Sequence, residues 1–413
     1  MTIKTPCGLL LEALGIIACF ERRISTIAFA LLMSVSVPVL HGEKCQFECL
    51  LLDTGMNGHV NTLVVFNDGS GPGLYAAGNF TQAGGNAAHG IAKWDGAAWS
   101  PLGAGMDGAR CFDLIVFDDG SGPALYAAGS FTQAGDTMAN GIAKWDGADW
   151  SPLGAGVRHG LFVYIMVLAV FDDGSGPALY AGGEFLQAGE IAANGIAKWN
   201  GADWSALDAG ASGGVLALAV FDDGSGTDLY AGGGFTRAGK SPANGIARWD
   251  GEEWSPLDSG VNSSVNRALT VFDDGRGSAL YAGGYFTQAG EMPANFIARW
   301  DGEAWSPLAI GAGLNGSVSA LTVFDDGGGP ALYAAGSFTE AGGKPASHIA
   351  KWNGVFWSPL GAGVNDTVNV LTVFDDGSGP AIYAGGEFTE AGGNPANYIA
   401  KWDGTVWSPV GGG

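Results

Sequence analysis

A motif of about fifty residues recurs seven times along this chain. Its clearest marker is a Phe followed by Asp-Asp-Gly or Asn-Asp-Gly, and successive copies lie 50 to 54 residues apart. The marker occurs at Phe66, Phe117, Phe171, Phe221, Phe272, Phe324 and Phe374. Repeats of this length are typical of propeller blades or of solenoids. The repeat therefore restricts the fold more strongly than any other feature of the sequence.

Each repeat contains four segments with strand character. In the sixth repeat these segments are 318–324, 331–343, 349–352 and 355–363. The pair Asn353-Gly354 before the last segment is a two-residue hairpin signal, because glycine supplies the positive φ that such turns need. No segment after residue 43 shows a sustained helical period. Each repeat is therefore predicted to form one four-stranded antiparallel sheet.

The tryptophans indicate how the sheets pack. All 14 fall in the repeats, two in each repeat and five residues apart. The first strand alternates only weakly between apolar and polar residues, as expected for sheets covered on both faces. Burying one Trp removes roughly 200 Å² from water, worth on the order of 5 kcal/mol gross. We predict an all-β fold, a seven-bladed β-propeller with four antiparallel strands per blade; an open solenoid is the alternative.

Composition supports a folded, acidic protein. The chain has 72 glycines, which suit many tight turns, and 11% aromatic residues, which argue against disorder. Its net charge is −23, so we expect no nucleic-acid partner and a soluble monomer. The five cysteines match no zinc-binding spacing. Cys45 could pair with Cys49, or one of them with Cys111.

The first 43 residues are predicted to be a signal peptide or N-terminal leader. The apolar run 24–40 follows Arg22-Arg23 and precedes a polar segment, which is the layout of a secretory signal. Removal of 1–43 takes away three basic and three acidic residues, so the net charge stays at −23. We expect a secreted, periplasmic or cell-surface protein whose mature form does not span a membrane; an uncleaved anchor is the alternative.

The segment between the leader and the repeats resembles the end of a repeat. Residues 47–58 imitate 97–108, with Cys49 in the position of Trp99, yet the seventh repeat has its own last strand near 406–411. Only one of the two can occupy the outer edge of the last blade. We predict that 44–58 forms an N-terminal strand that latches a propeller of residues 59–413; the alternative is that it lies spare.

The repeats resemble known propeller families. The succession LYAGG, IAKWDG and a second Trp resembles the kelch pattern, and GGxFTxAGGxxxxxIAKW is still more similar to the long-period (delta-sixty type) repeats of bacterial secreted proteins. The likeness covers 59–413 and departs where Ala-Gly replaces the di-glycine, at Ala77-Gly78, Ala128-Gly129 and Ala335-Gly336. It implies a propeller and no single activity, and the ligands of kelch-like copper oxidases are not matched.

The Asp-Asp-Gly turns carry 13 carboxylates, which a propeller would place on one face. They span 67–71, 118–122, 172–176, 222–226, 273–277, 325–329 and 375–379. Calcium prefers oxygens from short Asp/Gly loops, but Asp-Gly is also good turn chemistry. We predict structural turns and no cofactor, with calcium as the alternative.

A basic residue precedes the first Trp of every pair. These residues are Lys93, Lys144, Lys198, Arg248, Arg299, Lys351 and Lys401. We expect each to pair with the Asp or Asn after that Trp, or to lie over an aromatic ring. Repetition in every blade indicates a structural role.

Function is expected where the repeats differ, near the channel mouth. The predicted ligand-binding residues are Arg110, Asp113, Arg158, His159 and Arg267, a set that suits a small anionic ligand. Arg158 and His159 lie in an extended repeat three, and Arg267 lies where repeat five has an extra residue. Drift in loops that do not pack is the alternative explanation.

No catalytic or metal-binding residue is predicted. The five histidines do not cluster in the sequence, and acid–base or metal sites need at least one well-placed His. We therefore predict an exported, non-catalytic binding or surface-display module for a protein or glycan ligand. The alternatives are an exported glycan-acting lyase or hydrolase with a site at the channel mouth, and a piece of a longer surface protein.

Overall fold

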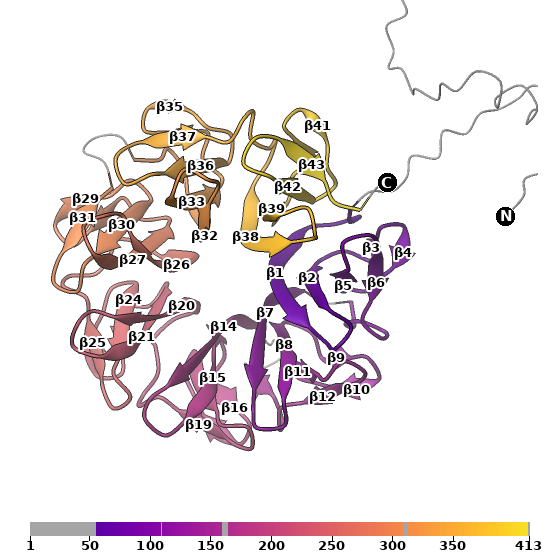
Figure 1. Cartoon of the computed structure of the whole chain (residues 1–413). Helices are drawn as coiled ribbons and strands as arrows, with labels where there is room; N and C mark the ends of the chain where they lie inside the picture. The colour runs from indigo at the N-terminus through magenta and orange to yellow at the C-terminus, as the bar shows by residue number, and fades with distance from the viewer. Residues whose placement is uncertain (1–54, 109, 159–163, 309–312, 412–413) are drawn as a thin grey trace, which may run out of the picture. The chain divides into compact units, whose positions relative to one another are not determined.

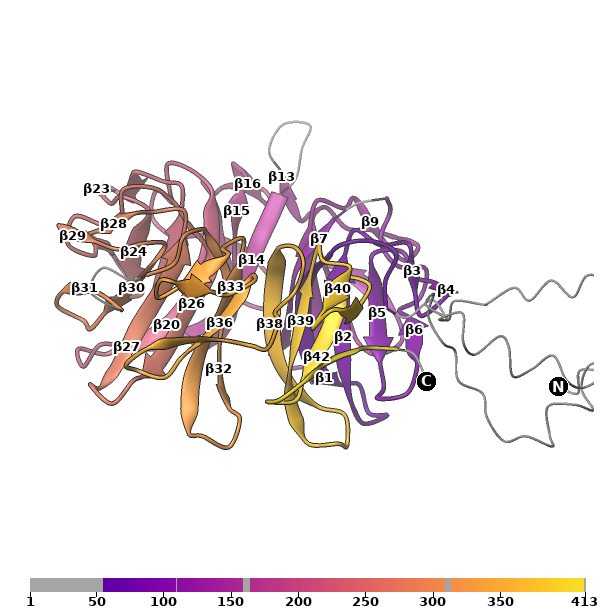
Figure 2. The ribbon, with the colours of Figure 1, turned by 90° about the horizontal axis from the view of Figure 1, so that it is seen from above.

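The computed structural model describes residues 55–108, 110–158, 164–308 and 313–411. These residues form seven four-stranded antiparallel sheets arranged as blades around a common centre (Figure 1). Residues of the first strands line a cavity there, which we call the central channel. Figure 2 shows the same ring from its edge. In every blade the strands are neighbours in chain order, and the first strand lies innermost. The predicted seven-bladed β-propeller is thereby confirmed. No described segment is a helix that is long and apolar enough to cross a membrane.

The four main strands of each blade have nearly constant lengths. Blade 1 has β1 (Val60–Asn67), β2 (Pro72–Gly78), β5 (Ile91–Trp94) and β6 (Trp99–Pro101). Blade 2 has β7 (Cys111–Asp118), β8 (Pro123–Gly129), β11 (Ile142–Trp145) and β12 (Trp150–Pro152). Blade 3 has β14 (Tyr164–Asp172), β15 (Pro177–Glu184), β18 (Ile196–Trp199) and β19 (Trp204–Ala206). Blade 4 has β20 (Val215–Asp222), β21 (Thr227–Gly233), β24 (Ile246–Trp249) and β25 (Trp254–Pro256).

The other three blades follow the same plan. Blade 5 has β26 (Val265–Asp273), β27 (Ser278–Gly284), β30 (Ile297–Trp300) and β31 (Trp305–Pro307). Blade 6 has β32 (Val318–Asp325), β33 (Pro330–Gly336), β36 (Ile349–Trp352) and β37 (Trp357–Pro359). Blade 7 has β38 (Val368–Asp375), β39 (Pro380–Gly386), β42 (Ile399–Trp402) and β43 (Trp407–Pro409).

A small hairpin between the second and third strands was not expected. The segment predicted as one strand, 331–343, ends as a strand at Gly336, and two-residue strands then pair across a glycine turn. These strands are β3 (Gln82–Ala83), β4 (Asn86–Ala87), β9 (Gln133–Ala134), β10 (Thr137–Met138), β16 (Gln187–Ala188), β17 (Ile191–Ala192), β22 (Arg237–Ala238), β23 (Ser241–Pro242), β28 (Gln288–Ala289), β29 (Met292–Pro293), β34 (Glu340–Ala341), β35 (Lys344–Pro345), β40 (Glu390–Ala391) and β41 (Asn394–Pro395). In blade 3, β13 (Val157–Arg158) joins as a third strand.

The strands define two faces of the ring. The turn face carries the turns from first to second strand and from third to fourth strand. The connection face carries the small hairpins and the links from each blade to the next. A β-bulge interrupts every first strand near the connection face, and in blade 5 the bulge holds one residue more than in the other blades. That extra residue matters for the channel described below.

Apolar side chains fill the space between neighbouring blades. The second strands are buried along nearly their whole length, whereas the first strands keep half-buried residues because one side faces the channel. All 14 tryptophans are buried, with exposed fractions of 1 to 8%. The outer Trp of several blades also donates its indole N–H to a leucine carbonyl of the preceding blade, as Trp204 does to Leu153 at 3.0 Å. The predicted role of the Trp pairs in joining the blades is confirmed.

Blade 7 packs against blade 1 and closes the ring. Val60 and Leu63 of the first blade share one apolar cluster with Phe374 and Ile399 of the seventh. The fourth strand of blade 7 is β43, from the C-terminal end of the chain. Gly55–Asn57 adds three backbone hydrogen bonds at this junction, including one from the Met56 N–H to the Asn397 carbonyl at 3.1 Å. The rest of the predicted latch, 44–54, and the leader lie outside the described residues.

Candidate functional site

Two of the five predicted ligand-binding residues meet in the central channel. Arg267 occupies the extra position in the blade 5 bulge, with a φ of +58°. Its guanidinium reaches across the channel and donates to the Phe112 and Met166 carbonyls, at 3.2 Å for Met166. It also lies 5.8 Å above the Phe112 ring. Arg267 therefore connects blade 5 with blades 2 and 3.

Asp113 lines the same channel cavity as Arg267 and interacts electrostatically with its guanidinium. One carboxylate oxygen accepts the Leu168 N–H at 2.7 Å, and the other accepts the Leu114 N–H at 2.9 Å and the Thr62 hydroxyl at 3.2 Å. Burial raises the pKa of Asp113, while Arg267 and these donors oppose the rise. Burial likewise lowers the pKa of Arg267, against the pull of Asp113. The two charges adjoin a channel cavity of about 140 Å³, and both are engaged by the protein itself.

The other three predicted residues lie elsewhere. Arg110 is exposed and lines a groove between blades 1 and 2. Arg158 is exposed on β13, where its carbonyl accepts the Leu186 N–H at 3.0 Å. His159 lies outside the described residues. The structure thus brings together Asp113 and Arg267, and it places Arg110 and Arg158 away from the channel cavity.

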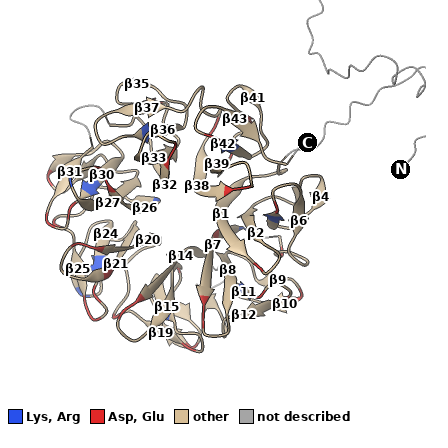
Figure 3. Ribbon diagram, in the orientation of Figure 1, with Lys and Arg blue, Asp and Glu red and all other residues tan. Residues whose placement is uncertain are grey.

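The Asp-Asp-Gly turns are built as structural turns. The first Asp caps its own turn, as Asp118 does by accepting the Gly120 and Gly122 N–H groups at 2.8 and 2.9 Å. The second Asp faces inward, so that Asp119 accepts the Tyr126 hydroxyl at 2.8 Å and the Lys144 ammonium at 2.5 Å. Figure 3 shows acidic residues spread around the ring, not gathered in one blade. No group of three His, Cys, Asp or Glu among the described residues is placed to hold a metal ion.

The repeated basic residues pair differently from the prediction. Lys93 contacts Asp68, the second Asp of its turn, at 2.6 Å, and not Asp95 after Trp94. The expectation of a pair with the residue after the Trp is wrong for the lysines because that Asp is engaged by the backbone N–H groups of its own hairpin turn. Arg299 is the exception, with Asp301 at 3.4 Å. The alternative, a cation near an aromatic ring, is correct for the five lysines: the Lys93 ammonium, for example, lies 5.6 Å from the Tyr75 ring centre.

The Asp–Tyr–Lys contacts predict that the free energy of unfolding is highest at intermediate pH and falls at both acid and alkaline pH. Partial burial pushes the pKa of Asp68 up, but bonds from Lys93, Ser70 and Tyr75 outweigh it and hold that pKa well below 3.8. Burial and Asp68 raise the pKa of Tyr75 well above 10. The Asp contribution is therefore present above about pH 4 and is lost as pH falls, whereas the Tyr contribution is present below about pH 10 and is lost as pH rises.

A Tyr75→Phe variant isolates the alkaline limb. Urea unfolding at a series of pH values should show a constant difference in the free energy of unfolding between wild type and variant from about pH 6 to 9, and a shrinking difference above about pH 10. The reason is that the variant has no hydroxyl to ionise. A difference that stays constant to about pH 11 would contradict the Asp68–Tyr75 coupling.

Cys111 is free and buried in the cluster between blades 1 and 2. Burial raises the pKa of its thiol to about 12. A thiol in that position is a packing group, equivalent to Val60 and Val215 of other blades. Cys45 and Cys49 lie outside the described residues.

Grooves between blades on the connection face were missed by the sequence reasoning. Three of them lie at equivalent junctions, with volumes of about 520 Å³ between blades 3 and 4, 530 Å³ between blades 4 and 5, and 260 Å³ between blades 1 and 2. Ligand pockets typically have volumes of roughly 300–1,000 Å³. Each groove contains the glycine that precedes a third strand: Gly195, Gly245 or Gly90.

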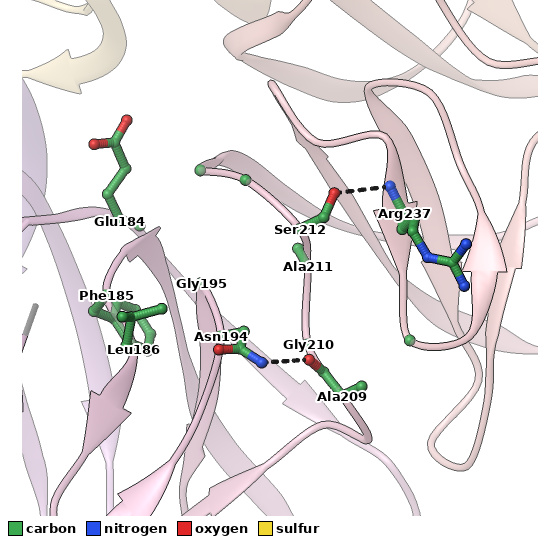
Figure 4. Close-up of a pocket in the computed structure, with 14 residues that line it drawn as sticks. Glu184, Phe185, Leu186, Asn194, Gly195, Ala209, Gly210, Ala211, Ser212 and Arg237 are labelled. Atoms are coloured by element: carbon green, nitrogen blue, oxygen red, sulfur yellow. Dashed lines mark hydrogen bonds between the residues drawn. The ribbon is translucent and has the colours of Figure 1, made fainter.

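The groove between blades 3 and 4 combines apolar and polar walls (Figure 4). Blade 3 supplies Glu184, Leu186 and Asn194, the connection 209–214 crosses beside them, and Arg237 belongs to blade 4. Asn194 donates to the Ala209 carbonyl at 2.9 Å. The Ser212 hydroxyl oxygen accepts the Arg237 N–H at 3.0 Å. These two hydrogen bonds fix the connection 209–214 to blades 3 and 4, and the groove between them stays open.

The leucine in this groove follows from a change in the neighbouring junction. In the six other junctions a Thr stands at the equivalent of Leu186, and an Asn, Asp or Ser of the preceding connection accepts its N–H, as Asn57 does from Thr81 at 2.8 Å. Before blade 3 that position is Arg158, and the backbone strand β13 replaces the side-chain bond. The position is exposed in every blade, so that Leu186, at 55% exposure, presents an apolar side chain where the other blades present a threonine. A comparison of the repeats at this position would have singled it out.

Solved structures resemble this chain distantly, at low sequence identity. No family model matches the sequence, and no curated protein sequence matches it. Among solved structures, the extracellular domain of the hybrid two-component system BT4673 from B. thetaiotaomicron is similar with a TM-score of 0.49 and 12% identity, over 81% of this chain and 38% of that one. BBS1N, solved in complex with ARL6DN, has a TM-score of 0.43 and 12% identity, over 81% and 91% of the two chains. The chain thus spans well under half the length of the first structure.

Proposed function

We propose that this protein is an exported, monomeric, non-catalytic binding module that takes up a segment of a partner polypeptide on its connection face. The observation that carries the proposal is the recurrence of an open groove at three equivalent blade junctions, with volumes of about 260, 520 and 530 Å³. A row of similar sites suits an extended chain better than a compact small molecule. The predicted leader 1–43 supports export. The di-glycine at the end of most second strands, with the Trp pair of the third and fourth strands, supports a kelch-like repeat.

The charged residues of the channel favour a structural role for that region. Arg267 bonds to two backbone carbonyls, and Asp113 accepts hydrogen bonds from three protein donors. A general acid, base or nucleophile needs a group that is free to meet its substrate. The grooves are therefore the stronger candidates for ligand contact, and the channel pair supports the ring that holds them.

The partner should carry a basic segment. The net charge of −23 creates a field that attracts cations and accelerates their association at low salt. Displayed random peptides should be selected by the purified protein, and the selected set should be enriched in Lys and Arg and bind more weakly at high salt. A glycan array and an assay for glycan cleavage run alongside. Binding to glycans without peptides, or cleavage of a glycan, would contradict the proposal.

A further inference from the structure

The residue before each third strand has a positive φ in every blade, but two kinds of residue hold the position. In blades 1–4 it is glycine: Gly90 (+74°), Gly141 (+76°), Gly195 (+70°) and Gly245 (+69°). In blades 5–7 it is Phe296 (+67°), His348 (+66°) or Tyr398 (+65°). The same backbone hydrogen bonds hold the position in both groups, since Gly195 and Tyr398 both donate to a Phe carbonyl on the small-hairpin side. A ring in this strained conformation costs roughly 1–2 kcal/mol, so its contacts must offset that cost.

The aromatic side chains close their junctions. Phe296 is half-buried and packs on the cluster between blades 5 and 6, which includes Leu314. Tyr398 is half-buried and packs on the cluster between blades 7 and 1, with its ring centre 5.5 Å from that of His59. These junctions therefore receive a ring-sized group from the chain itself.

The junction between blades 3 and 4 lacks that ring, and it also lacks the larger apolar side chain that the other junctions have at the position of Ala211. A Cβ atom on Gly195 would lie 3.0 Å from the Gly213 carbonyl oxygen and 3.8 Å from the Ala211 Cβ, and both residues line the groove. A side chain at Gly195 would thus enter the groove. At the position of Ala211, the six other junctions have Met56, Met106, Val157, Val261, Leu314 and Val364.

We propose that this groove binds the aromatic side chain of a Tyr or Phe in the partner polypeptide, as a substitute for the ring that Phe296 and Tyr398 supply in blades 5 and 7. The inference rests on the proposed function and names the group that the partner inserts. Leu186 offers an exposed apolar wall, and the Glu184 carboxylate at the rim suits a basic residue beside the aromatic one. A sugar ring fits less well because it prefers an open aromatic face, and Phe185 is only 2% exposed.

The test uses 4-fluorophenol as a minimal ring and follows its binding to the full chain by fluorine NMR. Wild type should bind it at one site. Gly195→Phe copies blade 5 and should weaken binding by about tenfold or more because the new ring fills the groove. Gly343→Phe is the matched control, since Gly343 has a similar φ of +72° and a Cβ there would meet nothing within 4 Å. It carries the same backbone strain and should bind like wild type.

A gain of binding makes the test two-sided. Tyr398→Gly combined with Met56→Ala reproduces, at the junction between blades 7 and 1, the Gly195 and Ala211 of the junction between blades 3 and 4. This double variant should bind a second equivalent of 4-fluorophenol, with partial recovery of the melting temperature. N-acetyl-leucinamide and glucose are the non-aromatic competitors. N-acetyl-tyrosinamide is the aromatic competitor and should displace 4-fluorophenol more effectively than either of them. The inference would be overturned if wild type and Gly195→Phe bound 4-fluorophenol equally, or if a non-aromatic competitor displaced it as effectively as N-acetyl-tyrosinamide. Peptide selection by wild type would then still support the proposed function, whereas its absence would remove both.

Discussion

Replacing Trp204 by alanine is expected to lower the free energy of unfolding by about 4 kcal/mol, since removal of a buried Trp costs roughly 3–5 kcal/mol. The side chain is 8% exposed, lies in the cluster between blades 2 and 3, and has its ring centre 5.3 Å from that of Trp199. Alanine would leave a cavity at the blade junction and remove one of the two hydrogen bonds that the Leu153 carbonyl accepts, the other coming from the Gly156 N–H. Urea unfolding followed by circular dichroism measures the loss.

Phenylalanine substitutions distinguish the contribution of the Trp204 hydrogen bond to stability from the contribution of its packing. Trp357 occupies the equivalent position in blade 6 and is also buried, at 3% exposure, and its indole nitrogen has no hydrogen-bond partner among the described residues. Trp204→Phe should therefore destabilise by about 1 kcal/mol more than Trp357→Phe. Equal losses would show that the bond to the Leu153 carbonyl contributes nothing.

Arg267→Met is expected to destabilise the propeller by about 3 kcal/mol, because it leaves Asp113 without its counter-charge in a poorly solvated place. It also removes the bonds to the Phe112 and Met166 carbonyls across the channel. The half-buried setting beside the channel cavity places the effect at the lower end for a buried pair. The midpoint and slope of urea unfolding report it.

Two further variants decide the cause. Asp113→Asn added to Arg267→Met should recover part of the loss, since the uncompensated carboxylate is then gone. Arg110→Gln removes an exposed arginine and should change stability by no more than about 0.5 kcal/mol. If Arg267→Met costs no more than Arg110→Gln, Arg267 is not a cross-channel tie.

Features that repeat in every blade were accessible from the sequence. The Phe–Asp–Asp–Gly spacing and the Trp pairs predicted the number of blades, the strand order and the buried indoles, because a sevenfold pattern averages out local ambiguity. The ends of the strands were less accessible. The small hairpins have two residues per strand, and such short pairs leave no periodicity to detect.

The site depended on contacts between distant repeats. The repeat breaks pointed to Asp113 and Arg267, but no spacing shows that Arg267 reaches blades 2 and 3 across the channel. The groove between blades 3 and 4 arises from missing side chains at Gly195 and Ala211. A missing side chain produces no recognisable sequence motif. An alignment of the repeats with one another nevertheless shows that blade 3 has Gly195 where blade 7 has Tyr398.

The junction between blades 7 and 1 is built like the junctions within the chain. Val410-Gly411 and Gly55-Met56 stand where Leu102-Gly103 and Gly105-Met106 stand in the unbroken link between blades 1 and 2, and Gly55 and Gly105 accept equivalent N–H groups, each at 2.7 Å. The two described chain ends therefore occupy the positions that a continuous link occupies between other blades. A circular permutant that joins residue 411 to residue 55 through a short spacer, and opens the link between blades 5 and 6, keeps every strand pairing found among the described residues.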